Sequence, residues 1–193
     1  MYFSYITTIF FKVINYSGIF IGTVALFLKK KYTPKHIIDV CKSRRSIYPK
    51  DFVEDKKIEE KHIYNSLEAA NWAPNHGKTQ PWRFVIFKGK DGIDKFHSMK
   101  IEAIKESNEL EESAKENMIS KAESKMKDIQ KCQYIIAICV KRVKNASGRL
   151  MPMWEEIAAT ACAVQNMQLV LWSYGIHGYW SSGGYGGWLH SKS

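Results

Sequence analysis

The stretch NWAPNHGKTQPWRFVIF, residues 71–87, decides how the rest of the sequence is interpreted. Its first part, Ala73-Pro74-Asn75-His76-Gly77, ends any preceding helix, because Pro cannot continue the helical hydrogen-bond ladder and Asn and Gly favour turns. Its second part, Trp82 to Phe87, is rich in aromatic and β-branched residues and is bounded by Pro81 and Gly89, which predicts a strand. The stretch therefore predicts a helix, a loop and a strand in close succession.

Hydrophobic patterns predict the elements on either side of this stretch. The helices are expected at about 36–45, 57–72, 93–131 (as one or two polar helices) and 154–174, and the strands at 82–87, 134–140 and 175–180. The run from Tyr134 to Val140 is continuously apolar, which predicts a central strand covered on both faces. The helix from Trp154 to Tyr174 is apolar almost all round, so we expect it to be buried in the body or in a subunit interface.

The composition is that of one globular domain with a short appendage. Hydrophobic residues make up 45% of the 193 residues, and charged residues make up 25%. The net charge of +10 favours anionic partners. However, the basic residues are spread along the chain and alternate with acids between Lys88 and Lys144, which is typical of a solvated helix face. We therefore expect no nucleic-acid partner.

The cysteines are not arranged as metal ligands. Cys41, Cys132, Cys139 and Cys162 form no CxxC pair and have no His at zinc-finger spacing. Cys132, Cys139 and Cys162 lie within or beside apolar runs, so we expect them to be small buried hydrophobes. Free thiols of this kind suit a reducing compartment.

The N-terminal segment is hydrophobic. The first 28 residues contain one charge, Lys12, and three lysines follow at 29–31. A membrane anchor fits the length of this segment and the lysines that follow it, and it would place the domain on the lysine-rich, cytoplasm-like side of the membrane. A cleaved signal, a transit peptide and an upstream extension of the predicted gene are alternatives, and a cytoplasmic location is the alternative to an anchored one. The chain then divides into a hydrophobic segment (1–31), a linker (32–35) and a domain (36–193).

Three blocks of sequence carry a family signature. The first is Arg44-Arg45-Ser46, the second runs from Trp72 to Phe84, and the third runs from Trp154-Glu155-Glu156 to Gly178-Tyr179-Trp180-Ser181-Ser182-Gly183. In this order and at these spacings they resemble the nitroreductase family, particularly its minimal single-domain members. The resemblance covers about residues 36 to 184.

The resemblance implies an α+β fold, a three-layer α/β/α sandwich whose mixed, mostly antiparallel sheet is flanked by helices; here a hydrophobic N-terminal helix would precede it. It also implies an obligate homodimer with FMN bound at the dimer interface. NAD(P)H would reduce the FMN, and a nitroaromatic, a quinone or another small acceptor would oxidise it in a ping-pong cycle. Since the cofactor transfers the hydride, no side chain is assigned as catalytic and no metal is expected.

The resemblance places the FMN contacts at Arg44, Arg45, Ser46, Trp72, His76, Lys78, Trp180, Ser181 and Ser182. Guanidinium groups and a hydroxyl suit the phosphate. Backbone N–H groups at 180–182 can donate to ring N5 and O4 as charge develops there. The alternatives are a solvated arginine pair at a helix end, core packing for Trp72 and a backbone-bonded turn for His76. Gln80-Pro81-Trp82 is expected to set the strand entry and to pack the core.

The sequence departs from the family pattern at three places. Ser181 stands where some minimal members have Arg, which removes one possible phosphate or substrate contact. Tyr48 occupies the position of a basic residue that often lies near flavin N1 and O2. The chain stops at Ser193, whereas relatives continue with a helix and a final strand that completes the sheet, so we expect an exposed sheet edge and a weakened dimer. This departure motivates a second hypothesis, a non-catalytic, membrane-tethered remnant that has lost flavin.

Overall fold

The structure, a computed structural model, describes residues 33–52 and 57–181. The chain divides into two compact units, Met1–Lys42 and Ser43–Ser193. Helix α2 (Pro34–Ser43) begins two residues earlier than predicted and ends before the predicted phosphate-binding arginines. The expected hydrophobic helix within residues 1–31 lies outside the described residues, as does Ser182. None of the described helices combines the length and the apolar character that a membrane crossing requires.

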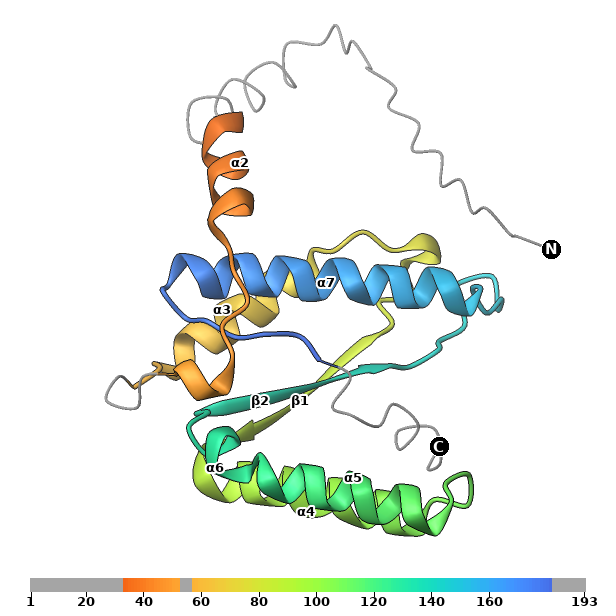
Figure 1. The fold of residues 1–193 in the computed structure, drawn as a ribbon. Helices are drawn as coiled ribbons and strands as arrows, with labels where there is room; N and C mark the ends of the chain where they lie inside the picture. Colours follow the sequence, from red (N-terminus) through yellow and green to blue (C-terminus); the bar gives the residue numbers. More distant parts are fainter. Residues whose placement is uncertain (1–32, 53–56, 182–193) are drawn as a thin grey trace, which may run out of the picture. The chain divides into compact units, whose positions relative to one another are not determined.

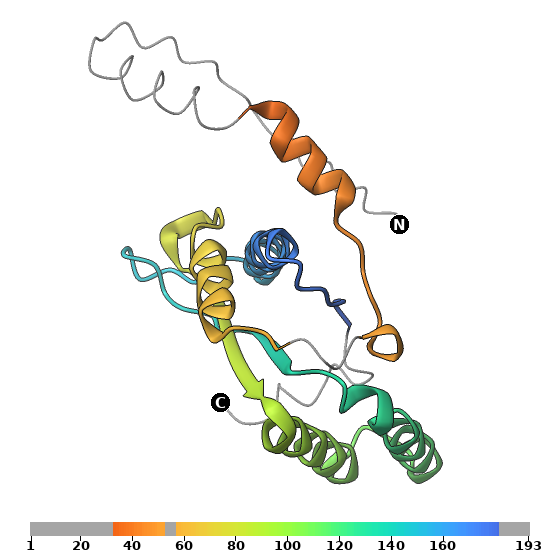
Figure 2. The same cartoon turned by 90° about the vertical axis from the view of Figure 1, so that its left-hand side faces the viewer.

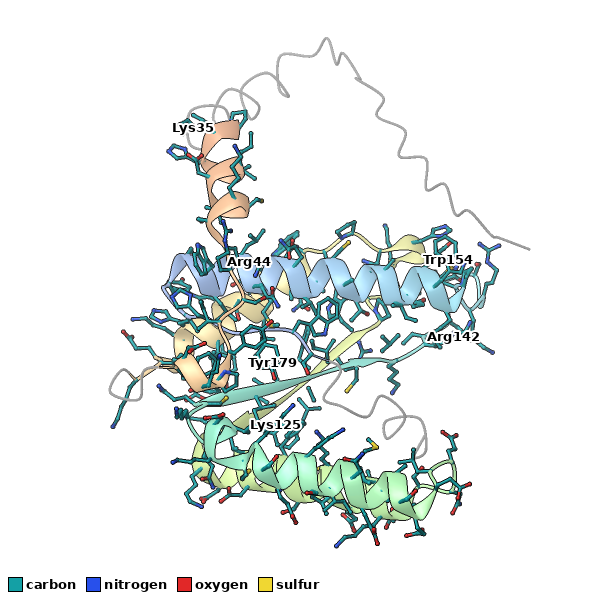
Figure 3. All side chains as sticks on the ribbon, in the orientation of Figure 1. Lys35, Arg44, Lys125, Arg142, Trp154 and Tyr179 are labelled. Atoms are coloured by element: carbon teal, nitrogen blue, oxygen red, sulfur yellow. The ribbon has the colours of Figure 1, made fainter. Side chains whose placement is uncertain are left out.

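The second unit is built in three layers (Figures 1 and 2). Its elements are η1 (Pro49–Asp51), α3 (Glu60–Asn71), η2 (His76–Lys78), β1 (Trp82–Lys88), α4 (Gly89–Glu106), α5 (Glu112–Ser124), α6 (Met126–Ile129), β2 (Tyr134–Val140) and α7 (Met153–Ser173). Helices α3 and α7 cover one face of the sheet, and α4 with α5 covers the other. Side chains from α7 and α4 fill the space on either side of the sheet (Figure 3). The predicted α+β layering is therefore confirmed.

The sheet joins the two strands that the sequence predicts most clearly. Strand β1 pairs with β2 in antiparallel register, with Trp82 opposite Val140 and Lys88 opposite Tyr134. Within the described part of the chain, β1 is the only strand that β2 pairs with, so its predicted central place in the sheet is wrong there. The β2 residues 134–139 are half-buried between the helical layers.

The predicted strand at 175–180 is also wrong, because the structure has irregular backbone there. Gly175 adopts a φ of 72° just after α7, a left-handed turn that glycine accepts without strain. Beyond it, the Gly178 carbonyl accepts a hydrogen bond from Ile47 N–H at 3.3 Å. This segment therefore meets the chain that follows α2 rather than a strand of the sheet.

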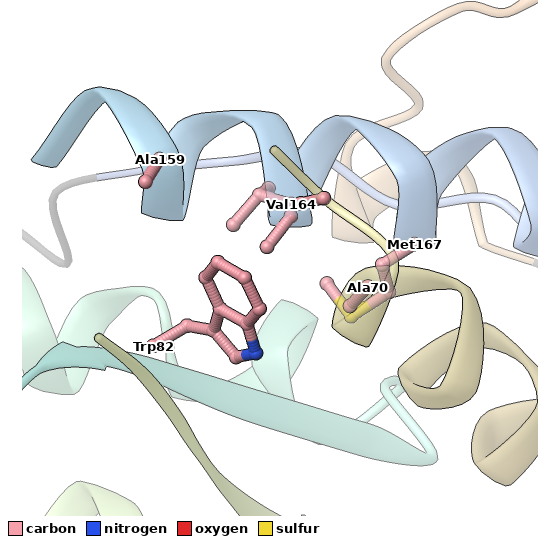
Figure 4. Packing of buried hydrophobic residues seen from close by; sticks show 7 residues of the cluster. Ala70, Trp82, Ala159, Val164 and Met167 are labelled. Carbon is pink, nitrogen blue, oxygen red and sulfur yellow. The ribbon is translucent and has the colours of Figure 1, made fainter. Parts of the chain in front are cut away.

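The core lies where the Trp82 indole packs beneath α7 and beside α3 (Figure 4). The residues around it are small or flexible, which lets the helices approach closely; they are Ala70, Ala73, Ala159, Ala163, Val164 and Met167. Trp82 is 4% exposed, and its Nε1 donates a 2.9 Å hydrogen bond to Asn71 Oδ1. Burying such a ring stabilises the fold by about 2–3 kcal/mol. The predicted structural roles of Pro81 and Trp82 are confirmed, since both are buried.

Helix α7 is buried on one side only. Ala163 and Val164 face the core, whereas Trp154 and Ile157 are 58% and 53% exposed. Cys162 is exposed, contrary to the expectation of a buried thiol, because it lies on the outward side of the helix. Cys132 and Cys139 are partly buried, and this burial raises the pKa of each thiol.

Candidate functional site

The loop that joins α3 to β1 begins with an exposed tryptophan. Trp72 caps the C-terminal end of α3 and is 81% exposed. The alternative role of core packing is therefore wrong for Trp72, and Trp82, ten positions on, fills the core instead. A large aromatic ring that is held at the surface, outside the body of its own chain, is available to a ligand or to a partner.

The same loop has an unusual backbone. Gly77, Lys78 and Gln80 all have positive φ, at 69°, 56° and 44°. The conformation is held by Asn75, whose Oδ1 accepts the Gln80 N–H at 3.0 Å. Left-handed backbone at non-glycine residues costs on the order of 1 kcal/mol each, and such strain clusters at ligand sites. The loop therefore projects Lys78 outward from a fixed turn.

Two neighbouring carboxylates at the start of α7 hold this loop. His76 Nδ1 lies 2.6 Å from Glu155 Oε2, and Thr79 Oγ1 donates to Glu156 Oε2 at 3.0 Å. His76 is thus bonded to a side chain and not, as the alternative held, to backbone. Glu156 is only 2% exposed, and its Oε1 has no hydrogen-bond partner among the described residues.

The sequence block Trp154-Glu155-Glu156 carried part of the family resemblance without an assigned role. Only one sequence signal points to the contacts of Glu155 and Glu156 with the loop. It is the presence of two acids in the first turn of a helix, where the helix dipole favours negative charge. Which loop residues these acids would hold depends on the packing of α7 against the α3–β1 loop.

The predicted phosphate-binding residues lie at the other end of α7. Arg44, Arg45 and Ser46 are in the irregular chain after α2, and Arg45 Nη1 donates to the Arg44 carbonyl at 2.8 Å. The hydrogen bond from Ile47 to Gly178 and the ring contact of Tyr48 with Tyr179, 5.0 Å between centroids, join this chain to the 178–181 segment. The structure therefore brings the first predicted block together with the segment that holds Trp180 and Ser181.

The predicted contacts thus form two groups in one chain. Trp172, near the C-terminal end of α7, donates to Ser43 Oγ at 2.9 Å, whereas Glu155 holds His76 at the N-terminal end. Figure 3 shows Arg44 toward the first end and Trp154 at the second. The helix between Glu155 and Trp172 is about 25 Å long at 1.5 Å per residue. The two groups are therefore held at opposite ends of α7.

A shallow hollow lies beside β1, with a volume of about 340 Å³. Its walls are Leu67, Asn71, Gln80, Trp82, Arg83 and Phe84. The Arg83 guanidinium is bonded to the carbonyls of Gln80 and Trp82 at 2.8 and 2.6 Å. None of the predicted FMN contacts lines this hollow. In residues 33–52 and 57–181, no group of three His, Cys, Asp or Glu side chains is placed to hold a metal ion.

The layered α+β fold, the half-buried Arg44, and the exposed Arg45, Ser46 and Trp72 are suited to a planar, phosphorylated cofactor. The chain belongs to the nitroreductase family, whose model matches residues 41–186. The predicted family is thereby confirmed. This family is one of oxidoreductases, and the relatives found among curated sequences carry provisional names of that kind.

The chain is similar to YfhC of Bacillus subtilis, which is provisionally named an NAD(P)H nitroreductase. The two are 28% identical over 146 residues, which cover 75% of this chain and 68% of YfhC. YdjA of Escherichia coli K12, with the same provisional name, is 29% identical over 121 residues, 63% of this chain and 60% of YdjA. The chain therefore spans about two thirds of the length of these relatives.

Solved structures support the fold. A nitroreductase-like family protein from Bacillus cereus superposes with a TM-score of 0.60 at 26% identity, covering 79% of this chain and 71% of that one. A BluB-like flavoprotein from Clostridium difficile 630 superposes with a TM-score of 0.51 at 16% identity. The superposition covers 72% of this chain and 70% of the flavoprotein chain. The second likeness concerns the fold alone.

Proposed function

We propose that this chain is an FMN-dependent oxidoreductase that takes hydride from NAD(P)H and passes it to a nitroaromatic, a quinone or a related small acceptor in alternating half-reactions. The observation that carries the proposal is that most of the predicted FMN contacts are exposed on the second unit and open to a ligand, namely Arg45, Ser46, Trp72, His76, Lys78, Trp180 and Ser181. The names of YfhC and YdjA support NAD(P)H as the donor.

The residues at the C-terminal end of α7 fit an FMN phosphate. Arg44 and Arg45 supply guanidinium forks and Ser46 supplies a hydroxyl, all on irregular chain next to the 178–181 segment. The backbone N–H groups of Trp180, Ser181 and Ser182 are proposed to donate to the flavin ring. FMN, when bound, supplies the hydride chemistry, so the protein's part is to fix its position and its electrostatics.

The separation of the two groups supports a site shared between two copies of the chain. One copy would supply Arg44, Arg45 and Ser46, and its partner would supply the loop with Trp72, His76 and Lys78. The outward side of α7 is suited to such a pairing, because Trp154, Ile157, Ala158 and Cys162 are exposed on it. Apolar surface of this kind is expected to be covered in an obligate dimer.

Association with a membrane through residues 1–31 stays part of the proposal, with a cytoplasmic protein as the alternative. The lysines at 29–31 would place the domain on the cytoplasm-like side of the bilayer. Fractionation of cells that express the full chain, followed by an alkaline carbonate wash, distinguishes an anchored protein from a loosely attached or free one.

The visible absorption spectrum of the purified full chain tests the proposed activity. We expect flavin bands that bleach under anaerobic NADPH or NADH and return when an acceptor such as menadione is added. A folded protein that stays colourless after incubation with FMN would refute the proposal and support the flavin-free remnant.

Mixing two variants tests whether the site is shared. The first carries Arg44→Ala and Arg45→Ala, and the second carries Trp72→Ala and His76→Ala. In a two-fold dimer with shared sites, each mixed dimer has one intact site, so unfolding and refolding the two together recovers about a quarter of the wild-type flavin content. If each site lay within one chain, every site would carry a defect and mixing would restore nothing.

A further inference from the structure

The chain between β2 and α7 folds into a hairpin, residues 141–151, which we call the basic hairpin. Lys144 and Leu150 form a bridge, and Asn145 N–H donates to the Arg149 carbonyl at 2.9 Å. The Asn145 side chain braces the turn from inside, since its Oδ1 accepts the N–H groups of Ser147 and Arg149 at 3.1 and 2.9 Å. Gly148 supplies the left-handed residue, with φ of 77°.

The basic hairpin concentrates positive charge without local compensation. It carries Lys141, Arg142, Lys144 and Arg149, all exposed, and no acid. None of the four forms an ion pair with any residue that the structure describes. The nearest acids along the chain, Glu155 and Glu156, are already engaged by His76 and Thr79.

The basic hairpin packs directly on the loop that is proposed to contact the flavin. A Cβ atom at Gly77 would lie 3.0 Å from Met151 Sδ and 3.4 Å from Asn145 Cβ, so only glycine fits there, at its φ of 69°. Lys78 follows at once and is exposed. Arg142 braces the base of the hairpin, its Nη2 donating to the Met151 carbonyl at 2.7 Å, and it lies by the N-terminal end of α7 (Figure 3).

We propose that the basic hairpin binds the 2′-phosphate of NADPH and makes NADPH the preferred hydride donor. The inference rests on the proposed function and names the donor for that same site. A nicotinamide that delivers hydride must lie against the flavin ring, which places the rest of the dinucleotide over the neighbouring surface. NADPH differs from NADH in one phosphate dianion, and Arg149 and Lys144, held on a fixed turn, offer cations that no carboxylate neutralises.

Binding of adenosine nucleotides tests the inference without flavin or turnover. Titration calorimetry of the full chain in mild detergent would compare adenosine 2′,5′-bisphosphate with 5′-AMP and inorganic phosphate at one ionic strength. We expect the bisphosphate to bind at least about tenfold more tightly than AMP, because its 2′-phosphate adds one charge-assisted contact. Lys144→Gln with Arg149→Gln should abolish that difference. Lys105→Gln with Lys121→Gln, which removes the same charge from exposed positions on α4 and α5, should leave it unchanged.

Equal affinities for the bisphosphate and AMP, or equal losses in the hairpin and control variants, would overturn the inference. Anaerobic stopped-flow reduction separates this failure from failure of the proposed function. If the inference holds, Lys144→Gln with Arg149→Gln slows bleaching by NADPH about tenfold or more and leaves bleaching by NADH unchanged. Bleaching by both donors at equal rates would refute the inference alone, whereas no flavin bleaching by either donor would refute the proposed function.

Discussion

The two sides of α7 have nearly the same apolar composition and different surroundings. The inward side, with Ala163 and Val164, is closed by Trp82 and by α3. The outward side, with Ile157 and Cys162, is exposed in the described chain. Apolar residues all round a helix therefore indicate that both sides will be covered, but they do not indicate whether the cover is the same chain or another one.

The comparison matters because the two sides of α7 would have different functions. The inward side sets the position of the α3–β1 loop, since the first turn of α7 holds His76 and Thr79. The outward side would decide whether a second copy brings its own loop to Arg44 and Arg45. Fold stability and site assembly are thus separable by substitutions a few residues apart on one helix.

The largest expected effect comes from placing a charge on each side. Ala163 is fully buried, so Ala163→Glu buries an unpaired carboxylate and should prevent folding. Ala158→Glu, on the exposed side, should leave a folded chain that is monomeric and has lost flavin, because it charges the proposed contact surface. Circular dichroism and light scattering measure the two outcomes. A dimeric, flavin-loaded Ala158→Glu protein would refute this division of roles.

Removing side-chain volume gives a graded version of the same comparison. Met167→Ala, at a residue that is 5% exposed, should lower the free energy of unfolding by about 2–5 kcal/mol. Ile157→Ala, at 53% exposure, should cost less than about 0.5 kcal/mol when measured in the monomeric Ala158→Glu background. Urea unfolding provides both free energies. A larger loss of unfolding free energy for Ile157→Ala in that background would mean that Ile157 is already covered by its own chain.

Thiol labelling shows the outward side directly. Cys162 is exposed, whereas burial raises the pKa of Cys132 and Cys139 and leaves less reactive thiolate near neutral pH. We expect Cys162 to react at least about tenfold faster in dilute, monomeric protein than at concentrations that favour the dimer. Mass spectrometry of the labelled peptides resolves the sites. The exposed Cys41 is the internal standard, and a Cys162 rate that does not change with concentration would contradict the proposed contact.

Local patterns in the sequence predicted several elements of this architecture correctly. Pro74 and Gly77 mark the end of α3, and the runs at 82–87 and 134–140 are strands as predicted. The exposure of Trp72 was beyond local reasoning, because an aromatic residue at a helix end is as consistent with a core as with a surface. The same holds for 175–180, where the sequence predicts a short strand but strand formation requires a neighbouring strand to pair with.

The candidate site shows the same limit at the level of single contacts. The sequence blocks of the site could be placed from the family resemblance. The roles of Glu155 and Glu156, in contrast, depend on side chains that lie 79 and 77 positions away along the chain, respectively. The contact of Gly77 with Asn145 and Met151 is of the same kind. Such long-range pairs are fixed by the packing of α7 on the α3–β1 loop, which no local pattern encodes.

Glu155 and Glu156, the two carboxylates that hold the α3–β1 loop, should differ in what they contribute to stability and to FMN binding. Thr79 and Glu156 are both buried, so Thr79→Val leaves a buried carboxylate without its donor and should cost about 1–3 kcal/mol of unfolding free energy. His76 is 62% exposed in its side chain and Glu155 21%, so Glu155→Gln should cost less than about 1 kcal/mol. Glu155→Gln frees the His76 ring without disturbing the core, and we therefore expect weaker FMN binding at nearly unchanged stability. Urea unfolding and FMN titration on the same protein measure both, and a stability loss as large as that of Thr79→Val would show that Glu155 serves the core rather than the loop.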